Sequence, residues 1–538
     1  MKTYLLLFLP LFLYANITLK ELIDSPKGHV RNFNIWQYMN SDISAAEADT
    51  AYSLVDGYNN KIFNRYAKIT QDKTIKEQYR CSRLDVDSLL NETNATCINH
   101  SLDLRTALKL NTLQRRRVLK ILENKYPNKS ELLNLMNSDN FIVDALNSSE
   151  KNYLKLFNSL GNVNREKYFN IKLSKERINA LAKEKAFEKS IKYIVTDPKM
   201  RHMQESLLLL EPHEFSAISY FFLGLNALQF KATKKALFYF EIAQKKAYYQ
   251  IDKDKALFWK YLVSKDSSVL KELALSSDIN IYTLYAHEKQ GVNVENYFTE
   301  QALKSKPSEI NIQDPYIWEE TLAKIRQADA QELNTMLEEY SSKDDDVLHA
   351  FIYSKAVKYK EHNYIMPYKK ATKELSNDNK ALLYALARQE SHFIPSAISR
   401  SYALGVMQMM PFLIKALAKQ EKETANLNEM FDPEKNISYA KKHLLYLQKH
   451  LYHPLFIAYA YNGGIGFTRR HLEKGTFRKG SYEPFLSMEL MANTESREYG
   501  KKVLANYVVY KQILNEEVKI TSLFETLTEP AHTDHFRR

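Results

Sequence analysis

Glycine and proline are scarce in this sequence, which has only 12 glycines and 14 prolines among 538 residues. Leucine, alanine, lysine, glutamate and tyrosine are abundant instead. Few helix breakers and many helix formers predict a nearly all-α protein. The hydrophobic share of 45% is ample for a core, which argues against a globally disordered chain.

Cysteine is rarer still, because only Cys81 and Cys97 are present. In an exported protein a single pair of cysteines usually forms a disulfide, and we predict one here. Closing a loop of this size contributes roughly 3 kcal/mol of stability. Two unpaired buried thiols are the alternative. No cluster of histidines or cysteines accompanies the pair, so we expect no metal site.

The sequence opens with a short apolar run. Lys2 supplies a positive flank, residues 4–14 the apolar stretch, and Ala15 a small residue for cleavage. This pattern predicts a secretory signal peptide at residues 1–15 and therefore a periplasmic protein. The run is too short to span a membrane comfortably, so we expect no stable membrane insertion after cleavage. An uncleaved anchor is the alternative.

The formal net charge is +12. A basic protein favours polyanions, which include nucleic acid, anionic membranes and acidic cell-wall polymers. The sequence has neither a long basic tract nor an RNA-binding motif with interleaved aromatic residues, so nucleic acid is the weaker option.

The distribution of glycine divides the chain. Five glycines precede residue 400, and seven lie between Gly405 and Gly500. Residues 215–230 and 231–247 resemble a tetratricopeptide-like helix pair, and residues 254–289 resemble another. We therefore predict an α-superhelical solenoid over residues 16–350, with linker helices from about 300. A catalytic domain should follow at 351–520, and a loose polar tail at 521–538.

Glu390 and Ser391 close a helix-like run at residues 381–391, and either Ser376 or Asp378 can cap the start of the helix. Leu382, Leu383, Leu386 and Ala387 form its apolar stripe, and Glu390 follows Leu386 by four residues on the same face. A carboxyl group in that position is partly desolvated, which raises its pKa and keeps it protonated nearer neutral pH. A general acid for glycoside cleavage needs this property. A solvated glutamate at a helix end is the alternative.

Four further segments strengthen the first interpretation. They are ESHFIPSAIS at 390–399 with GVMQMMP at 405–411, FDPEKNI at 431–437, AYNGG at 460–464, and Glu489 followed by ESREY at 495–499. In this order they resemble the soluble lytic transglycosylases, whose catalytic domain has a goose-type-lysozyme-like fold behind an N-terminal helical superhelix. Tyr402 departs from the pattern, since the family usually has glycine there.

The resemblance implies a mechanism for Glu390 as the single acid and base. It would protonate the glycosidic oxygen between N-acetylmuramic acid and N-acetylglucosamine, with help from the substrate's acetamido group. It would then accept the proton of the sugar's 6-hydroxyl, which closes a 1,6-anhydro ring. No cofactor or metal is implied. Peptidoglycan glycan strands are the expected partner, and cell-wall synthesis proteins are candidate protein partners.

Eight further residues are predicted to bind the substrate. The segments at 390–399 and 405–411 supply two hydroxyls, one amide and one soft apolar side chain. The turn at 460–464 and the helix start at 495–499 supply two residues each. Tyr461 is expected to stack on a sugar or to bond Glu390, and Arg497 to hold Glu495. The predicted set is Ser391, Ser399, Gln408, Met410, Tyr461, Asn462, Glu495 and Tyr499.

Two other functions fit parts of the sequence. A goose-type lysozyme would use water as the nucleophile and leave a reducing end. A non-catalytic scaffold would bind glycan or a protein through its helical repeats, but the intact Glu390 argues against it.

Overall fold

The structure is a computed structural model that describes residues 17–301 and 303–537. Its regular elements are almost entirely helical, which confirms the predicted all-α class. The only paired strands among these residues are two-residue segments, β1 (Tyr297–Phe298) and β2 (His362–Asn363), which run parallel. No helix in the described part of the chain combines the length and the hydrophobicity needed to cross a bilayer. The predicted signal peptide lies outside the described residues.

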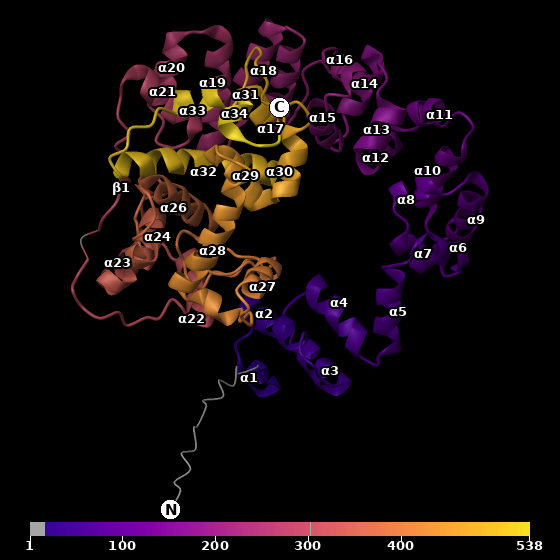
Figure 1. The fold of residues 1–538 in the computed structure, drawn as a ribbon. Helices are drawn as coiled ribbons and strands as arrows, with labels where there is room; N and C mark the ends of the chain where they lie inside the picture. The colour runs from indigo at the N-terminus through magenta and orange to yellow at the C-terminus, as the bar shows by residue number, and fades with distance from the viewer. Residues whose placement is uncertain (1–16, 302, 538) are drawn as a thin grey trace, which may run out of the picture.

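The first part of the chain is a curved array of helices that Figure 1 shows sweeping around one side of the molecule. Its members are α1 (Leu19–Asp24), α2 (His29–Tyr38), α3 (Ala45–Ser53), α4 (Asn60–Ile69), α5 (Lys73–Cys81), α6 (Val86–Asn91), α7 (Ala95–Ser101), α8 (Leu104–Lys109), α9 (Thr112–Leu122), α10 (Pro127–Asn137), α11 (Phe141–Asn147), α12 (Glu150–Ser159), α13 (Asn162–Phe169), α14 (Lys175–Ala182), α15 (Phe187–Val195), α16 (Arg201–Leu207), α17 (Ala217–Gln229), α18 (Thr233–Lys246), α19 (Gln250–Ser264), α20 (Ser267–Ala274) and α21 (Ile281–Gln290).

The remaining helices form the C-terminal half. They are α22 (Pro315–Gln327), α23 (Ala330–Glu339), η1 (Lys343–Asp345), α24 (Asp346–Ala356), α25 (Lys369–Thr372), α26 (Asn377–Ser391), α27 (Pro411–Gln420), η2 (Asn428–Phe431), α28 (Pro433–Gln448), α29 (Pro454–Gly463), α30 (Ile465–Leu472), α31 (Phe485–Glu489), α32 (Thr494–Ile513), α33 (Ile520–Thr526) and α34 (Pro530–Thr533). The domain boundary predicted at 350/351 falls inside α24, a continuous helix, and the boundary remains a prediction.

Local sequence signals explain why the array breaks into short helices. Thr18, Ser44 and Asn111 each cap a helix start, and a glutamate or glutamine three residues later completes a capping box. Helices of 6 to 11 residues gain little stability alone, so they depend on packing against their neighbours. The tightest stack is α17, α18 and α19, where Trp259 and Phe240 are fully buried. Aromatic side chains therefore form the core at this point.

The array curls back onto the C-terminal half. The carboxylate of Glu319 on α22 accepts hydrogen bonds from the backbone amides of His29 (2.6 Å) and Val30 (3.3 Å) at the start of α2. Asn34 of α2 donates to the Tyr316 hydroxyl at 3.0 Å. Elements nearly 300 residues apart thus meet, and the chain closes into a ring around the gap seen in Figure 1.

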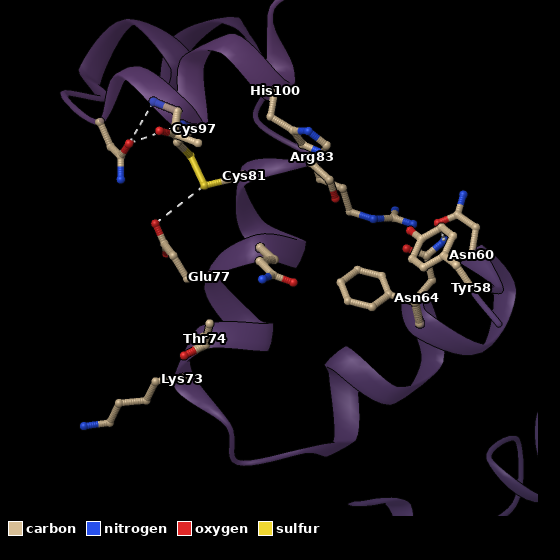
Figure 2. A pocket seen from close by; sticks show the side chains of 15 residues that line it. Tyr58, Asn60, Asn64, Lys73, Thr74, Glu77, Cys81, Arg83, Cys97 and His100 are labelled. Atoms are coloured by element: carbon tan, nitrogen blue, oxygen red, sulfur yellow. Dashed lines mark hydrogen bonds between the residues drawn. A yellow bond between two sulfur atoms is a disulfide. The ribbon is translucent and has the colours of Figure 1, made fainter. Parts of the chain in front are cut away.

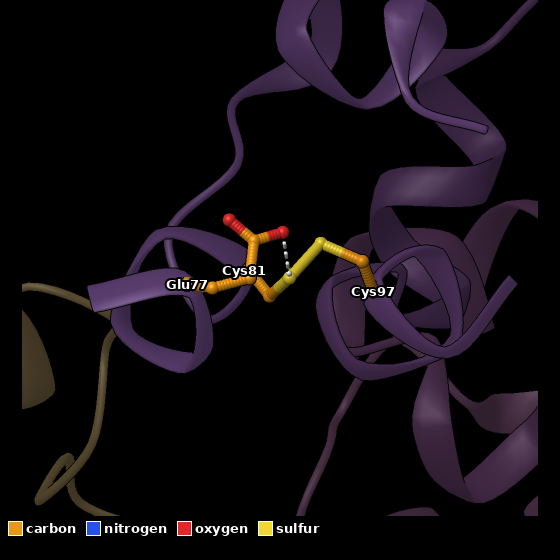
Figure 3. Close-up of side chains that lie close together, drawn as sticks. All are labelled: Glu77, Cys81 and Cys97. Carbon is orange, nitrogen blue, oxygen red and sulfur yellow. Dashed lines mark hydrogen bonds between the residues drawn. A yellow bond between two sulfur atoms is a disulfide. The ribbon is translucent and has the colours of Figure 1, made fainter. Parts of the chain in front are cut away.

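A disulfide joins two short helices of the N-terminal arm, the part of the array that consists of α1–α7. Cys81 at the end of α5 and Cys97 in α7 are bonded, with their Cα atoms 4.9 Å apart (Figure 3). Glu77 Oε1 lies 3.6 Å from Cys81 Sγ, but a disulfide sulfur carries no proton to donate. Since both sulfurs are bonded to each other, Glu77, Cys81 and Cys97 are not a metal-binding set despite their proximity.

The C-terminal residues are not the loose tail that the polar sequence predicted. Ile520, Phe524 and Leu527 are buried at the helical spacing of one face, and α33 packs on α21. Arg537 donates to the Asp534 carboxylate and to the Phe477 carbonyl oxygen, at 2.8 and 2.9 Å. The prediction gave too much weight to composition and too little to this short apolar stripe.

Close helix packing makes Gly500 a test of the fold. A Cβ atom at Gly500 of α32 would overlap the ring of Tyr459 on α29. We predict that Gly500→Ala destabilises the protein by about 1–3 kcal/mol, because the buried ring has to move. Gly466→Ala in α30 is the matched control, since its nearest neighbour would lie at an ordinary 3.5 Å. Thermal unfolding of both variants checks this, and equal midpoints would contradict it.

Candidate functional site

Glu390 lies in the last turn of α26, the helix that the sequence predicted. Ser376 caps the helix by accepting a hydrogen bond from the backbone amide of Asn379 at 3.3 Å. Leu382, Leu383, Leu386 and Ala387 are all buried, so their face points into the domain. Glu390 shares that face and is only partly exposed.

The environment of Glu390 favours its protonated form. Burial raises the pKa of the carboxyl to about 7. The Tyr499 hydroxyl donates to Glu390 Oε1 at 2.6 Å and lowers the pKa, while the negative charge of Glu495 raises it. Burial and the neighbouring Glu390 hold the pKa of Tyr499 well above its usual range, so Tyr499 remains a donor. A carboxyl that titrates near neutrality can both give and accept a proton.

The loop after α26 is built on a glycine and a buried asparagine. Gly405 has φ +74°, and a side chain there would overlap the Met430 carbonyl oxygen. The Asn436 side chain accepts from the Met407 amide at 2.8 Å and donates to the Leu404 carbonyl oxygen at 2.9 Å. Sequence reasoning placed Asn436 in the FDPEKNI segment but assigned it no part in the site. A buried amide inside a motif was the available signal.

Two of the predicted contact residues form hydrogen bonds within the loop. Ser391 is buried, and its hydroxyl donates to the Val406 carbonyl oxygen at 2.7 Å. The Ser399 hydroxyl accepts from the Ala403 amide at 2.9 Å. Both serine oxygens therefore serve the turn, in which a hydroxyl readily replaces a backbone partner.

Gln408 and Met410 are both half-buried. The side-chain amide of Gln408 donates to the carbonyl oxygens of Ala397 (3.0 Å) and Gly405 (2.9 Å), so its NH₂ group is used within the loop. Met410 immediately precedes α27, and its role as a soft apolar wall of the site remains a prediction.

Tyr461 lies close to the acid without bonding it. Its hydroxyl donates to the Met407 carbonyl oxygen at 2.8 Å, so the predicted alternative of a bond to Glu390 is wrong. The negative charge of Glu390 nevertheless adds to the effect of burial, and together they raise the pKa of Tyr461 well above its usual range. The Tyr461 ring is half-buried. The other alternative, in which this ring stacks on a sugar, stays a prediction.

Asn462, and not Arg497, holds Glu495. The Asn462 side chain donates to Glu495 Oε1 at 3.3 Å and accepts from the Ser496 hydroxyl at 2.8 Å. Arg497 instead bonds Glu498 at 2.8 Å. The expected Arg497–Glu495 pair is wrong because residues two apart on a helix point to different faces. Glu495 is exposed, in contrast to the half-buried Glu390.

Glu489, the first residue of the last predicted segment, does not reach the site. It is almost fully buried, with its carboxylate 2.9 Å from Lys501 Nζ and 2.5 Å from the Tyr282 hydroxyl of α21. Lys501 also pairs with Glu498 at 3.0 Å. This buried network ties α32, which carries Tyr499, to the helical array.

A cavity of about 1160 Å³ lies in the N-terminal arm (Figure 2). Tyr58, Asn60 and Arg83 line one part of it, and the Cys81–Cys97 disulfide lines another. None of the predicted site residues is among those that line it. The candidate chemistry is therefore assigned to the constellation around Glu390 and not to this cavity.

A family model matches the part of the chain that contains Glu390. Residues 367–483 match the family model described as the transglycosylase SLT domain. This match spans about a fifth of the chain and identifies an SLT domain at residues 367–483. The SLT match includes Glu390, Gln408 and Tyr461, and it ends before Glu495 and Tyr499.

Sequence relatives match only a part of this chain. The soluble lytic murein transglycosylase of Escherichia coli (strain K12) is 30% identical over 144 residues, which are 26% of this chain and 22% of the relative. Membrane-bound lytic murein transglycosylase C of Edwardsiella ictaluri is 32% identical over 120 residues, 20% of this chain and 33% of the relative. The match thus spans only about a fifth to a third of these relatives.

A solved structure extends the likeness to most of the chain. An inactive mutant of the lytic transglycosylase Slt from Pseudomonas aeruginosa aligns with a TM-score of 0.50 at 16% identity. The alignment covers 93% of this chain and 86% of that protein. The helical array followed by an SLT domain is therefore a known fold, as the sequence predicted.

Replacing the acid tests its environment independently of any activity. The folded-state pKa of Glu390, about 7, lies above the usual 4.5, so its contribution to stability is complete below pH 4.5 and is lost as the pH rises through 7. This difference corresponds to at most roughly 3 kcal/mol. We predict that Glu390→Gln becomes progressively more stable than the wild type between pH 4.5 and 7, and that the difference is constant above.

Thermal unfolding at several pH values measures this difference. The exposed Glu374, in the same domain, supplies the matched control Glu374→Gln. A stability difference between Glu390→Gln and the wild type that does not change with pH would contradict the raised pKa.

Proposed function

We propose that this protein is a periplasmic lytic transglycosylase that cleaves the β-1,4 bond between N-acetylmuramic acid and N-acetylglucosamine in peptidoglycan. The observation that carries the proposal is the half-buried Glu390 carboxyl, which titrates near pH 7 and accepts a hydrogen bond from Tyr499 within an SLT domain. The chain's positive charge suits glycan strands that bear carboxylated peptides. The periplasmic location rests on the predicted signal peptide, and cell-wall synthesis proteins remain predicted partners.

In the first step, protonated Glu390 gives its proton to the glycosidic oxygen as the bond from that oxygen to the anomeric carbon breaks. The oxygen of the substrate's acetamido group bonds the anomeric carbon and replaces the departing sugar. Tyr499 then stabilises the Glu390 carboxylate through its hydrogen bond, which strengthens when the acceptor becomes charged.

In the second step, the sugar's own 6-hydroxyl oxygen attacks the anomeric carbon and releases the acetamido oxygen. Glu390 takes the hydroxyl proton and is restored to its starting form. One group serves as acid and then as base because its pKa lies close to neutrality. No water is consumed, and the product carries a 1,6-anhydro ring.

Glu495 favours one rival, a hydrolase of the goose-lysozyme type. Its carboxylate is close enough to raise the pKa of Glu390, and a pair of carboxylates is what an inverting glycosidase uses to activate water. Asn462 donates a hydrogen bond to the Glu495 carboxylate at 3.3 Å. The two reactions differ in product mass and in their need for Glu495.

Digestion of purified cell wall separates these functions. We predict muropeptides that are lighter by one water than hydrolysis products, as measured by mass spectrometry. Glu390→Gln should lower the cleavage rate by about a thousandfold, because an amide is too weak an acid to protonate the glycosidic oxygen. Glu495→Gln should still form anhydro products, and Glu374→Gln should match the wild type.

Two results would contradict the proposal. Reducing-end products that disappear in Glu495→Gln would assign a hydrolase. Full cleavage by Glu390→Gln would remove Glu390 from the reaction altogether.

A further inference from the structure

Tyr402 lies at the tip of the loop that follows the catalytic helix, yet its side chain is completely buried. Its neighbours Arg400 and Ser401 are exposed. The Tyr402 ring inserts between helices α2 and α4 of the N-terminal arm. Three aromatic rings of α2 surround it at centroid distances of 5.5, 5.4 and 5.3 Å, and these belong to His29, Phe33 and Trp36.

Polar groups of the same arm hold the tip of the loop. Asn59, which caps α4, donates to the Tyr402 hydroxyl at 2.7 Å. Lys61 donates to the Ser401 carbonyl oxygen at 2.6 Å, and its ammonium lies 5.1 Å from the centre of the Tyr402 ring. The His29 ring donates through Nε2 to the Ser399 carbonyl oxygen at 2.9 Å. All three donors come from residues 29–61 and all three acceptors from residues 399–402.

The arm is itself fixed at this point. Glu319 of α22 accepts hydrogen bonds from the first turn of α2, as described above, and Gln37 of α2 donates to Asn428 at 3.1 Å. The contact at Tyr402 is therefore part of the junction that closes the ring. A loop tip that packs against two helices and accepts three hydrogen bonds has little freedom to move.

Short interactions lead from Tyr402 to the acid. Leu404 forms bridges with Ile398 and with Met409, so the loop is doubly paired two residues after Tyr402. The next carbonyl groups, of Val406 and Met407, accept from Ser391 and Tyr461. Ser391 is adjacent to Glu390, and the Tyr461 pKa responds to the Glu390 charge. A shift of the loop would therefore move the groups on both sides of the acid.

We infer that Tyr402 is a positioning residue, which uses the N-terminal arm to hold loop 397–409 in the geometry that catalysis needs. Glycine, which the family resemblance leads us to expect at this position, has no side chain to make these contacts. A displacement of about 1 Å in a catalytic site can cost a hundredfold in rate. The inference rests on the proposed function for its rate measurement, but not for its structural measurement.

The test uses the full-length protein and two measurements. Tyr402→Gly removes the ring and the hydroxyl, Tyr402→Phe removes only the hydroxyl, and Trp36→Ala weakens the same contact from outside the SLT domain. Tyr52→Ala is the matched control, because Tyr52 stacks on Tyr66 at 3.9 Å in the same arm. Cleavage of purified peptidoglycan gives kcat and KM, and hydrogen exchange reports the protection of amides 397–409.

Tyr402→Gly should lower kcat by about tenfold or more and change KM by less than about twofold, since the loss concerns the transition state. Exchange over 397–409 should rise. Trp36→Ala should show the same pattern more weakly and decides the question if Tyr402→Gly does not fold. Tyr402→Phe should stay within about threefold of the wild type, since one hydrogen bond is lost. Tyr52→Ala should match the wild type in both measurements.

Wild-type kcat and wild-type exchange in both Tyr402→Gly and Trp36→Ala would overturn the inference. Increased exchange without a loss of kcat would also overturn it, because the contact would then be structural only. If the wild-type protein itself shows no cleavage, the proposed function fails. Unchanged exchange at 397–409 in the variants would then still show, on its own, that Tyr402 does not hold the loop.

Discussion

The hydrogen bond between Tyr499 and Glu390 is the interaction on which the rest of the site depends. Burial alone would favour a permanently neutral carboxyl, and full hydration would favour a permanently charged one. The Tyr499 hydroxyl at 2.6 Å lowers the pKa of Glu390 and so offsets part of the effect of desolvation. The negative charge of Glu495 raises this pKa, in the same direction as desolvation. The balance leaves the pKa near neutrality, which is where one group can serve as both acid and base.

The partners in this bond come from separate helices, so the larger architecture has to keep them together. Tyr499 is on α32, which the buried Glu489–Lys501 pair and Tyr282 join to the helical array. The loop beside Glu390 is held by Asn436 from within the SLT domain and by α2 and α4 from outside it. The helical ring thus contacts the site from two sides, which gives the array a role beyond that of a passive support.

The sequence predicted the features that repeat or that belong to a motif. The all-α class follows from the scarcity of helix breakers, and the face of α26 that carries Glu390 follows from Leu382, Leu386 and their period. The predictions that were wrong concern which side chains bond to one another. The bond from Tyr461 goes to a carbonyl oxygen, and Glu495 is held by Asn462 instead of Arg497. The bonds of Tyr461 and Asn462 depend on how separate elements meet in space, which the pattern along one helix does not show. The absent Arg497–Glu495 pair has a local reason, because residues two apart on one helix point to different faces.

Long-range contacts explain the remaining differences. Tyr402 reads as an oddity in the sequence, because its partners lie some 340 residues away in α2 and α4. Glu489 belongs to one of the segments that resemble the family, yet its side chain forms a buried ion pair with Lys501 and lies outside the site. The tail after residue 520 appears polar, but three apolar residues at helical spacing are enough to fold it against α21.

Direct titration of the acid tests the account most closely. Difference infrared spectra between the wild type and Glu390→Gln, recorded across the pH range, isolate the carboxyl band of this one side chain. We predict a midpoint at about pH 7, which moves lower in Glu495→Gln and higher in Tyr499→Phe. A midpoint near the usual 4.5, unmoved by either substitution, would contradict the desolvated acid on which the whole account rests.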